Sequence, residues 1–267
     1  MLEAAAAAGL KTVSLTDHDA VGAYRHWPGL LERAKALGLD LKVGIELDTQ
    51  FLEQEVHLLG YDFHLDDPDL NEHLDKVQKQ RRLRIGDQVR QVNRMVGREL
   101  IRHEELFPQG RDTLMKPHLI RPLLETGTVG EQYGEVQKWF GEHVHTSFEV
   151  DKLPMREAIA MIHRAGGKAV LAHPGFIKGL PEDRLAPFLG LVLDRLQAWG
   201  LDGVEVAYNY QDPRRAEREP DAEAQREARL VATIRRLCLE RNLLMTRGSD
   251  AHRAEDIAPF ATRGFQG

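Results

Sequence analysis

Six side chains that commonly bind metal ions stand at or just after the ends of short apolar runs in this sequence. They are His18, Glu46, His57, His173, Asp250 and His252. A barrel of alternating strands and helices gathers its catalytic residues at the carboxyl ends of its strands. Imidazoles mixed with carboxylates suit Zn, Mn or Fe better than Ca or Mg. The set therefore indicates a metal-dependent hydrolase.

Four of these residues lie in three motifs in which an apolar run ends in histidine or aspartate: SLTDHD (14–19), VLAHPG (170–175) and RGSDAH (247–252). Asp250 and His252 are two residues apart, so in an extended strand they point to the same face. His173 precedes Pro174 and Gly175, where the backbone must turn sharply. Glu46 and His57 are ambiguous individually, because a lone polar residue after a strand is more often structural. Their case depends on lying at successive strand ends.

The elements that must position these residues follow an alternating pattern. We expect strands over 12–19, 41–47, 55–61, 168–175, 201–209 and 243–252, and helices over 2–8, 28–37, 154–167, 181–199 and 220–241. This alternation predicts parallel strands with helices outside them. Residues 70–107, 113–126 and 130–140 are helical in pattern, followed by a strand at 144–150. We therefore divide the chain into a first barrel part (1–70), a helical insertion over the barrel mouth (71–150) and a second barrel part (151–267).

Composition is that of an ordinary globular protein, with 267 residues, 42% hydrophobic and 29% charged. A net charge of −6 argues against nonspecific binding of nucleic-acid phosphates by the whole surface, although a local basic patch is compatible with this charge. The single cysteine, Cys238, cannot form an intrachain disulfide, which fits a reducing cytoplasm. No apolar stretch approaches the length of a membrane span, and residues 2–10 do not read as a signal peptide. We expect a cytoplasmic enzyme with no membrane association and no stable nucleic-acid complex.

Five motifs in order resemble those of the PHP family (polymerase and histidinol phosphatase domain): TDHD, GIEL, EVHLLGY, AGGKAVLAHPG and GSDAH. The helical insertion, with KPHLIRPLLETGTV (116–129), is similar to the branch of nucleotide phosphoesterases, which hydrolyse phosphates of nucleotides or short RNA. The resemblance covers about residues 5–253. It implies a distorted (β/α)7 TIM-like barrel that binds up to three Mn, Fe or Zn ions, where a bridging hydroxide attacks phosphorus.

The resemblance also implies a role for each candidate ligand. The expected ligands of the first, second and third metal are, in turn, Glu46 with Asp250; Glu46 with His57 and His173; and His18 with His252. Glu46 and Asp250 are the residues expected to act in catalysis itself. Asp17 and Asp19 are expected to orient His18 and its loop.

The family's first strand carries an HxH motif followed by an aspartate, and this sequence begins at the helix that should follow that strand. Only the site of Glu46, His57 and His173 is then fully supplied. We expect that a segment carrying this first strand precedes Met1 in the full protein, and the alternative is a degenerate homologue with weak or no activity. The HxH spacing of His143 and His145 is expected to be an exposed pair, not a replacement.

Several basic and polar residues are candidates for binding the substrate phosphate. Lys116 and His118 resemble an arginine and a histidine in the family's cap, and lysine keeps the charge but loses the guanidinium fork. Weaker candidates are Arg121, Arg81 and Arg84 in the basic run KQRRLR (79–84), Lys178 and Asn209. The alternative for each is an ordinary solvated surface group.

Three functions compete. The first is a metal-dependent phosphoesterase that acts on nucleotides or the ends of short RNA or DNA. The second is a histidinol-phosphate-type phosphatase, against which the large helical insertion argues. The third is a catalytically impaired, truncated homologue that binds a nucleotide or a partner without turnover.

Overall fold

The computed structural model describes residues 1–106, 112–180, 184–211 and 213–258. Its strands are β1 (Thr12–Leu15), β2 (Asp40–Phe51), β3 (Gln54–Tyr61), β4 (Leu153–Pro154), β5 (Lys168–Leu171), β6 (Gly203–Ala207) and β7 (Leu244–Arg247). Its α-helices are α1 (Leu2–Ala7), α2 (Gly22–Arg25), α3 (Leu30–Ala36), α4 (Pro68–Val96), α5 (Lys116–Glu125), α6 (Tyr133–His143), α7 (Met155–Arg164), α8 (Leu185–Gln197), α9 (Pro213–Arg218) and α10 (Pro220–Glu240). Short 3-10 helices are η1 (His103–Leu106), η2 (Pro174–Phe176) and η4 (Ala254–Asp256).

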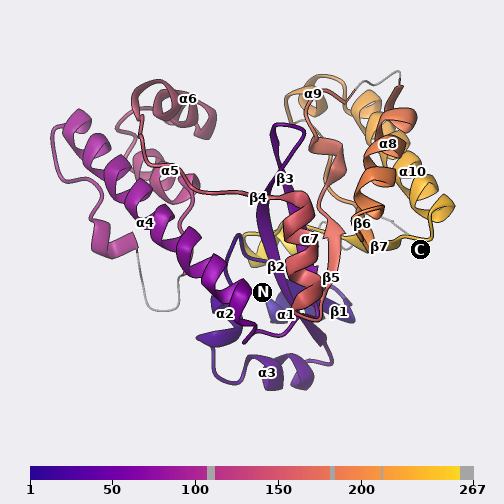
Figure 1. Cartoon of the computed structure of the whole chain (residues 1–267). Helices are drawn as coiled ribbons and strands as arrows, with labels where there is room; N and C mark the ends of the chain where they lie inside the picture. Colours follow the sequence, from indigo (N-terminus) through magenta and orange to yellow (C-terminus); the bar gives the residue numbers. More distant parts are fainter. Residues whose placement is uncertain (107–111, 181–183, 212, 259–267) are drawn as a thin grey trace. The chain divides into compact units, whose positions relative to one another are not determined.

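The chain forms two compact units, labelled by element in Figure 1. The sheet unit contains residues 1–16, 29–67 and 153–267. The helical unit contains residues 68–152 together with residues 17–28, which follow β1. The segment that carries His18 therefore belongs to the helical unit.

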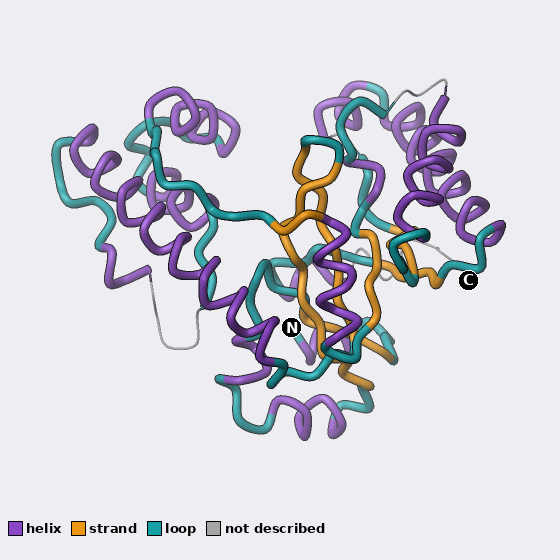
Figure 2. Tube along the Cα trace, in the orientation of Figure 1, coloured by secondary structure: helices purple, strands orange, loops and turns teal. Residues whose placement is uncertain are grey.

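The sheet unit is a mixed α/β structure built on one curled, open sheet, drawn in orange in Figure 2. Its strand order is β1-β2-β3-β5-β6-β7, and the short strand β4 makes an additional pairing with β2. The pairs β1–β2, β2–β4, β5–β6 and β6–β7 are parallel. Helix α7 packs against β2, β3 and β5, while α8 and α10 pack against each other. Among the described residues, no pairing joins β1 to β7.

The expected parallel pairing is wrong for β2 and β3, which form an antiparallel hairpin. Leu52 and Glu53 connect the two strands, and both have positive φ (50° and 59°). Two successive positive φ angles are the geometry of a type I′ hairpin turn, which usually selects asparagine and glycine. Neither asparagine nor glycine stands at these two positions, so the sequence does not indicate this turn. Strand β3 also pairs antiparallel with β5.

The helical unit has its own apolar core. Helix α4 runs as one long element through it, and α5 and α6 lie beside each other (Figure 1). Buried side chains of these three helices, among them Val89, Leu119 and Phe140, form one cluster. Helix α4 ends at Val96, before Gly97 with φ of 70°. The helical unit is thus built around one long helix, as the pattern that begins at residue 70 predicts, although α4 ends at Val96 and not at residue 107.

The strand expected at 144–150 is wrong, because that segment has no strand partner. The backbone of this segment, and that of Asp151 just after it, is instead bound by side chains of α4. The backbone N–H of His145 donates to Gln91 Oε1 (3.0 Å), and the N–H of Asp151 donates to Gln80 Oε1 (2.9 Å). Among the helices that the structure describes, none is both long and apolar enough to cross a membrane.

Candidate metal centre

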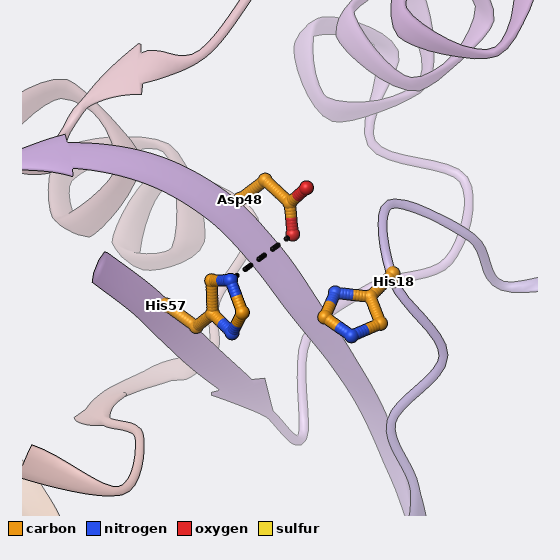
Figure 3. Close-up of side chains that lie close together, drawn as sticks. All are labelled: His18, Asp48 and His57. Carbon is orange, nitrogen blue, oxygen red and sulfur yellow. Dashed lines mark ion pairs between the residues drawn. The ribbon is translucent and has the colours of Figure 1, made fainter. Parts of the chain in front are cut away.

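The antiparallel hairpin places three polar side chains on one face of the sheet. Glu46 and Asp48 are two residues apart on β2, so they share a face. In the register of the hairpin, Asp48 lies directly opposite His57 of β3. Figure 3 shows these two side chains on neighbouring strands, with the ion pair between Asp48 Oδ1 and His57 Nε2 (3.6 Å) dashed. Glu46 and Asp48 are buried, with 7% and 6% of their surface exposed.

His173 reaches the same place from β5. It follows the strand by two residues and has φ of 23°, an unusual value for a residue other than glycine. Glu46 Oε1 lies 2.8 Å from His57 Nδ1 and 3.1 Å from His173 Nε2. The two imidazole nitrogens lie 3.3 Å apart. Three potential ligand atoms from three strands therefore converge on one point.

This donor set fits a divalent transition metal. Ligands bound at about 2.0–2.2 Å in tetrahedral or octahedral geometry are separated from each other by about 2.8–3.6 Å. The three distances between Glu46, His57 and His173 are 2.8, 3.1 and 3.3 Å, within this range. Two imidazoles and one carboxylate leave coordination positions for water and substrate, which is the pattern of catalytic sites. We therefore name these three residues the ligand triad.

The other ring nitrogen of His57 faces carboxylates. His57 Nε2 lies 3.3 Å from Glu55 Oε1 and 3.6 Å from Asp48 Oδ1. A histidine ligand commonly donates its second N–H to a carboxylate, which fixes the ring. Burial acts against the charged form of His57, but hydrogen bonds to Glu46 and Glu55 outweigh it and raise the pKa of His57 to about 10. A metal bound at the triad would displace the proton on His57 Nδ1.

Glu205 of β6 holds the backbone of His173 in place. Its Oε2 accepts the backbone N–H of His173 at 2.9 Å, which holds the strained turn. Only 5% of its surface is exposed. A Cβ at Gly248 would approach Glu205 Oε1 to 1.7 Å, so a side chain there would displace the Glu205 carboxylate. Burial, together with the charges of Glu46 and Asp250, raises the pKa of Glu205 to about 8 against the opposing hydrogen bond from His173.

The raised pKa of Glu205 predicts a pH dependence for the metal-free protein. The folded state binds this proton more tightly than the unfolded chain, so the stabilisation is fully present below pH 4.5 and is lost as the pH rises to about 8. We expect Glu205→Gln to be more stable than the wild type at pH 9 and to differ less at pH 5. Urea unfolding in EDTA at both pH values measures this. Glu223→Gln, a change at a buried carboxylate of α10, is the control. Equal pH dependence in wild type and Glu205→Gln would contradict the assignment.

Asp250 and His252 of the sheet unit are not members of the triad. Asp250 is exposed, and its Oδ2 accepts the hydroxyl proton of Tyr208 at 2.6 Å. Burial and the bond to Asp250 raise the pKa of Tyr208 above its usual value. His252 is exposed, with Nδ1 2.9 Å from the backbone oxygen of Asp250. His18 is half-buried and belongs to the helical unit.

In the loop after β1, Asp17 is exposed, whereas Asp19 is buried with φ of 45°. Asp19 Oδ2 accepts a short charge-assisted bond from Arg81 Nη2 of α4. Gln78 Nε2 donates to the backbone oxygen of Asp19 at 3.1 Å. The expected phosphate ligand Arg81 is thus buried, with 7% of its surface exposed, and binds the loop of His18.

The other expected phosphate ligands differ in their surroundings. The Nδ1 atom of His118 accepts the backbone N–H of Met115 at 3.1 Å, at the start of α5. The ammonium group of Lys116 lies 5.1 Å from the centroid of the Phe140 ring. The exposed members are Arg84, Arg121, Lys178 and Asn209.

Four residues around the triad were not expected from the sequence: Asp48, Glu55, Glu205 and Tyr208. Asp48 had a usable signal, because alternation along a strand that carries Glu46 places residue 48 on the same face. Glu205 and Tyr208 contact the site through pairing of β5 with β6, which the sequence alone does not specify.

No family model matches the chain. A 5′-3′ exoribonuclease of Haemophilus influenzae is 24% identical over 216 residues, which is 78% of this chain and 72% of the relative. A 3′,5′-nucleoside bisphosphate phosphatase of Chromobacterium violaceum is 25% identical over 212 residues, covering 78% and 70% of the two chains. Both relatives are hydrolases, which confirms the prediction that the chain is a hydrolase.

Two solved structures share the fold. An amidohydrolase from Chromobacterium violaceum, with bound sulfate and no metal, has a TM-score of 0.71 and 20% identity, covering 96% of this chain and 83% of the other. A protein from Bifidobacterium adolescentis, provisionally described as a metal-dependent phosphoesterase, has a TM-score of 0.69 and 23% identity, covering 95% and 81%. At these identities the likeness supports the mixed α/β fold with its curled sheet.

Proposed function

We propose that this protein is a metal-dependent phosphoesterase of the PHP type, which hydrolyses phosphate from nucleotides or from the ends of short oligonucleotides. The observation that carries the proposal is the convergence of Glu46 Oε1, His57 Nδ1 and His173 Nε2 within 3.3 Å of one another. The names of the exoribonuclease and the bisphosphate phosphatase support the substrate class. The triad supports dependence on a divalent metal.

The triad and the residues around it have different roles in this proposal. Glu46, His57 and His173 would hold the metal, which when bound would lower the pKa of a water molecule and screen the charge of the phosphate. Glu205 fixes the backbone of His173. Glu55 and Asp48 face the second nitrogen of His57 and keep its ring oriented. Such fixed ligands reduce the reorganisation that the reaction requires.

Further features belong to the same proposal. The curled sheet would be a distorted (β/α)7 barrel, and the helical unit a cap that helps to bind substrate. Asp250, His18 and His252 would serve additional metals, up to three in all, of the Mn, Fe or Zn type. The proposed place of action is the cytoplasm.

The phosphate would be recognised by basic and polar groups. The proposed set is Lys116, His118, Arg84, Arg121, Lys178 and Asn209. The burial of Arg81 against Asp19 favours a role for Arg81 in holding the loop of His18 over direct contact with phosphate.

A phosphate-release assay tests the proposal. With Mn²⁺ present, we expect adenosine 3′,5′-bisphosphate or a 5′-phosphorylated RNA trimer to exceed histidinol phosphate in kcat/KM by at least about tenfold. Addition of EDTA should abolish release and Mn²⁺ should restore it. Preference for histidinol phosphate would favour the second function. Binding of nucleotide without any release would favour the catalytically impaired homologue and contradict our proposal.

A further inference from the structure

One aromatic side chain beside the ligand triad is exposed. Phe176 follows His173 by three residues in η2, and 52% of its surface is accessible. The centroid of its ring lies 5.8 Å from that of His173. A single exposed apolar residue needs no explanation by itself. The position of this one, next to a candidate metal ligand, gives it a surface within reach of anything bound at the triad.

The loop that carries Phe176 is fixed at several points. Pro174 and Ile177 are buried on either side of it. A Cβ at Gly175 would meet the Tyr210 ring at 2.6 Å, so the backbone lies directly against that ring. Gln54, at the tip of the β2–β3 hairpin, makes two bonds to the backbone of Lys178. Its Oε1 accepts from the N–H at 2.7 Å, and its Nε2 donates to the oxygen at 3.3 Å. Phe176 is therefore presented on a preorganised support.

Two tyrosines contact the ring without stacking flat on it. Phe176 and Tyr208 have centroids 5.4 Å apart at an interplanar angle of 90°. Phe176 and Tyr210 have centroids 5.6 Å apart at 65°. Within the described part of the chain, no ring lies parallel to Phe176. Edge-type contacts of this kind orient an aromatic ring while leaving surface for a planar ligand.

We propose that Phe176 is the platform on which the base of the substrate stacks while its phosphate is held at Glu46, His57 and His173. Stacking on an aromatic side chain is tolerant of base identity, because every base has a π-face. The inference rests on the proposed function and deepens it. It assigns the site to phosphates that carry a nucleobase and predicts that the site binds them more tightly than simple sugar phosphates.

Equilibrium binding tests the platform without requiring turnover. Adenosine 5′-monophosphate (AMP) and ribose 5-phosphate share a phosphate and a sugar, and only AMP carries a base. Titration calorimetry in Mn²⁺, with phosphate release followed in parallel, compares both probes on wild type, Phe176→Ala and Phe176→Tyr. Phe148→Ala, a change at another half-exposed phenylalanine in the helical unit, is the matched control.

We expect wild type to bind AMP more tightly than ribose 5-phosphate. Phe176→Ala should weaken AMP binding about tenfold and leave ribose 5-phosphate unchanged. Phe176→Tyr and Phe148→Ala should bind AMP as wild type does. Equal affinity of wild type for the two probes, no binding of AMP, an unchanged AMP affinity in Phe176→Ala, or an equal loss for both probes would overturn the inference.

Turnover separates this inference from the proposed function. If no phosphate ester is hydrolysed but AMP binding still depends on Phe176, the proposed function fails and the platform stands. If nucleotides are hydrolysed and Phe176→Ala has the wild-type KM for them, the proposed function stands and the platform is overturned.

Discussion

Glu46→Gln is expected to lower metal-dependent phosphate release by about a thousandfold or more. Glu46 Oε1 is the atom that both histidines of the triad approach, at 2.8 and 3.1 Å. The amide keeps the shape of the side chain but removes the negative charge, so the triad loses its one anionic ligand. A bound metal contributes several kcal/mol to such reactions, and each factor of ten corresponds to about 1.4 kcal/mol.

Metal content and rate should be measured on the same preparation of Glu46→Gln. Inductively coupled plasma analysis after Mn²⁺ loading should show less metal than in wild type, and kcat should fall with it. Glu223→Gln is the matched control, because Glu223 is also a buried carboxylate (3% exposed) but pairs with Arg226 on α10. Wild-type metal content and rate in Glu46→Gln would rule out the triad as the metal site.

Arg81→Met is expected to destabilise the protein by roughly 3–5 kcal/mol, the usual cost of breaking a buried ion pair by removing one partner. Asp19 is 1% exposed and Arg81 is 7% exposed. Methionine fills a similar volume but leaves the Asp19 carboxylate without its charged partner in a buried site. Urea unfolding followed by circular dichroism measures the change.

The double variant Asp19→Asn with Arg81→Met separates this effect from the loss of a surface cation. With the buried charge removed, most of the lost stability should return, since a neutral replacement of a buried pair is often tolerated. If Arg81 contacts substrate instead, Arg81→Met should leave the unfolding midpoint unchanged and raise KM. That pattern would contradict the structural role assigned here.

The sequence was most informative where local pattern determines structure. The strand that leads to His173 and the helix that begins near residue 70 were predicted because alternation and helical periodicity are local signals. The expectation that Glu46 and His57 lie at strand ends is wrong, because both lie inside the long strands β2 and β3. Alternation also places Asp48 on the same face of β2 as Glu46. The hairpin was missed because Leu52 and Glu53 lack the composition of the turn that they adopt.

Long-range contacts account for the other differences. Residues 144–150 resemble a strand locally, but Gln91 and Gln80 of α4 bind the backbone at His145 and Asp151 in place of a neighbouring strand. The support of His173 by Glu205 depends on β5 lying next to β6. Neither contact can be read from one sequence, because each depends on which distant segments pack together.

Anomalous diffraction at the Mn edge from crystals grown with Mn²⁺ tests the central claim most directly. The account predicts a peak about 2.0–2.2 Å from Glu46 Oε1, His57 Nδ1 and His173 Nε2. The contradicting result is a fully loaded crystal whose Mn²⁺ peaks lie elsewhere, with the three side chains still bonded to one another at 2.8–3.3 Å.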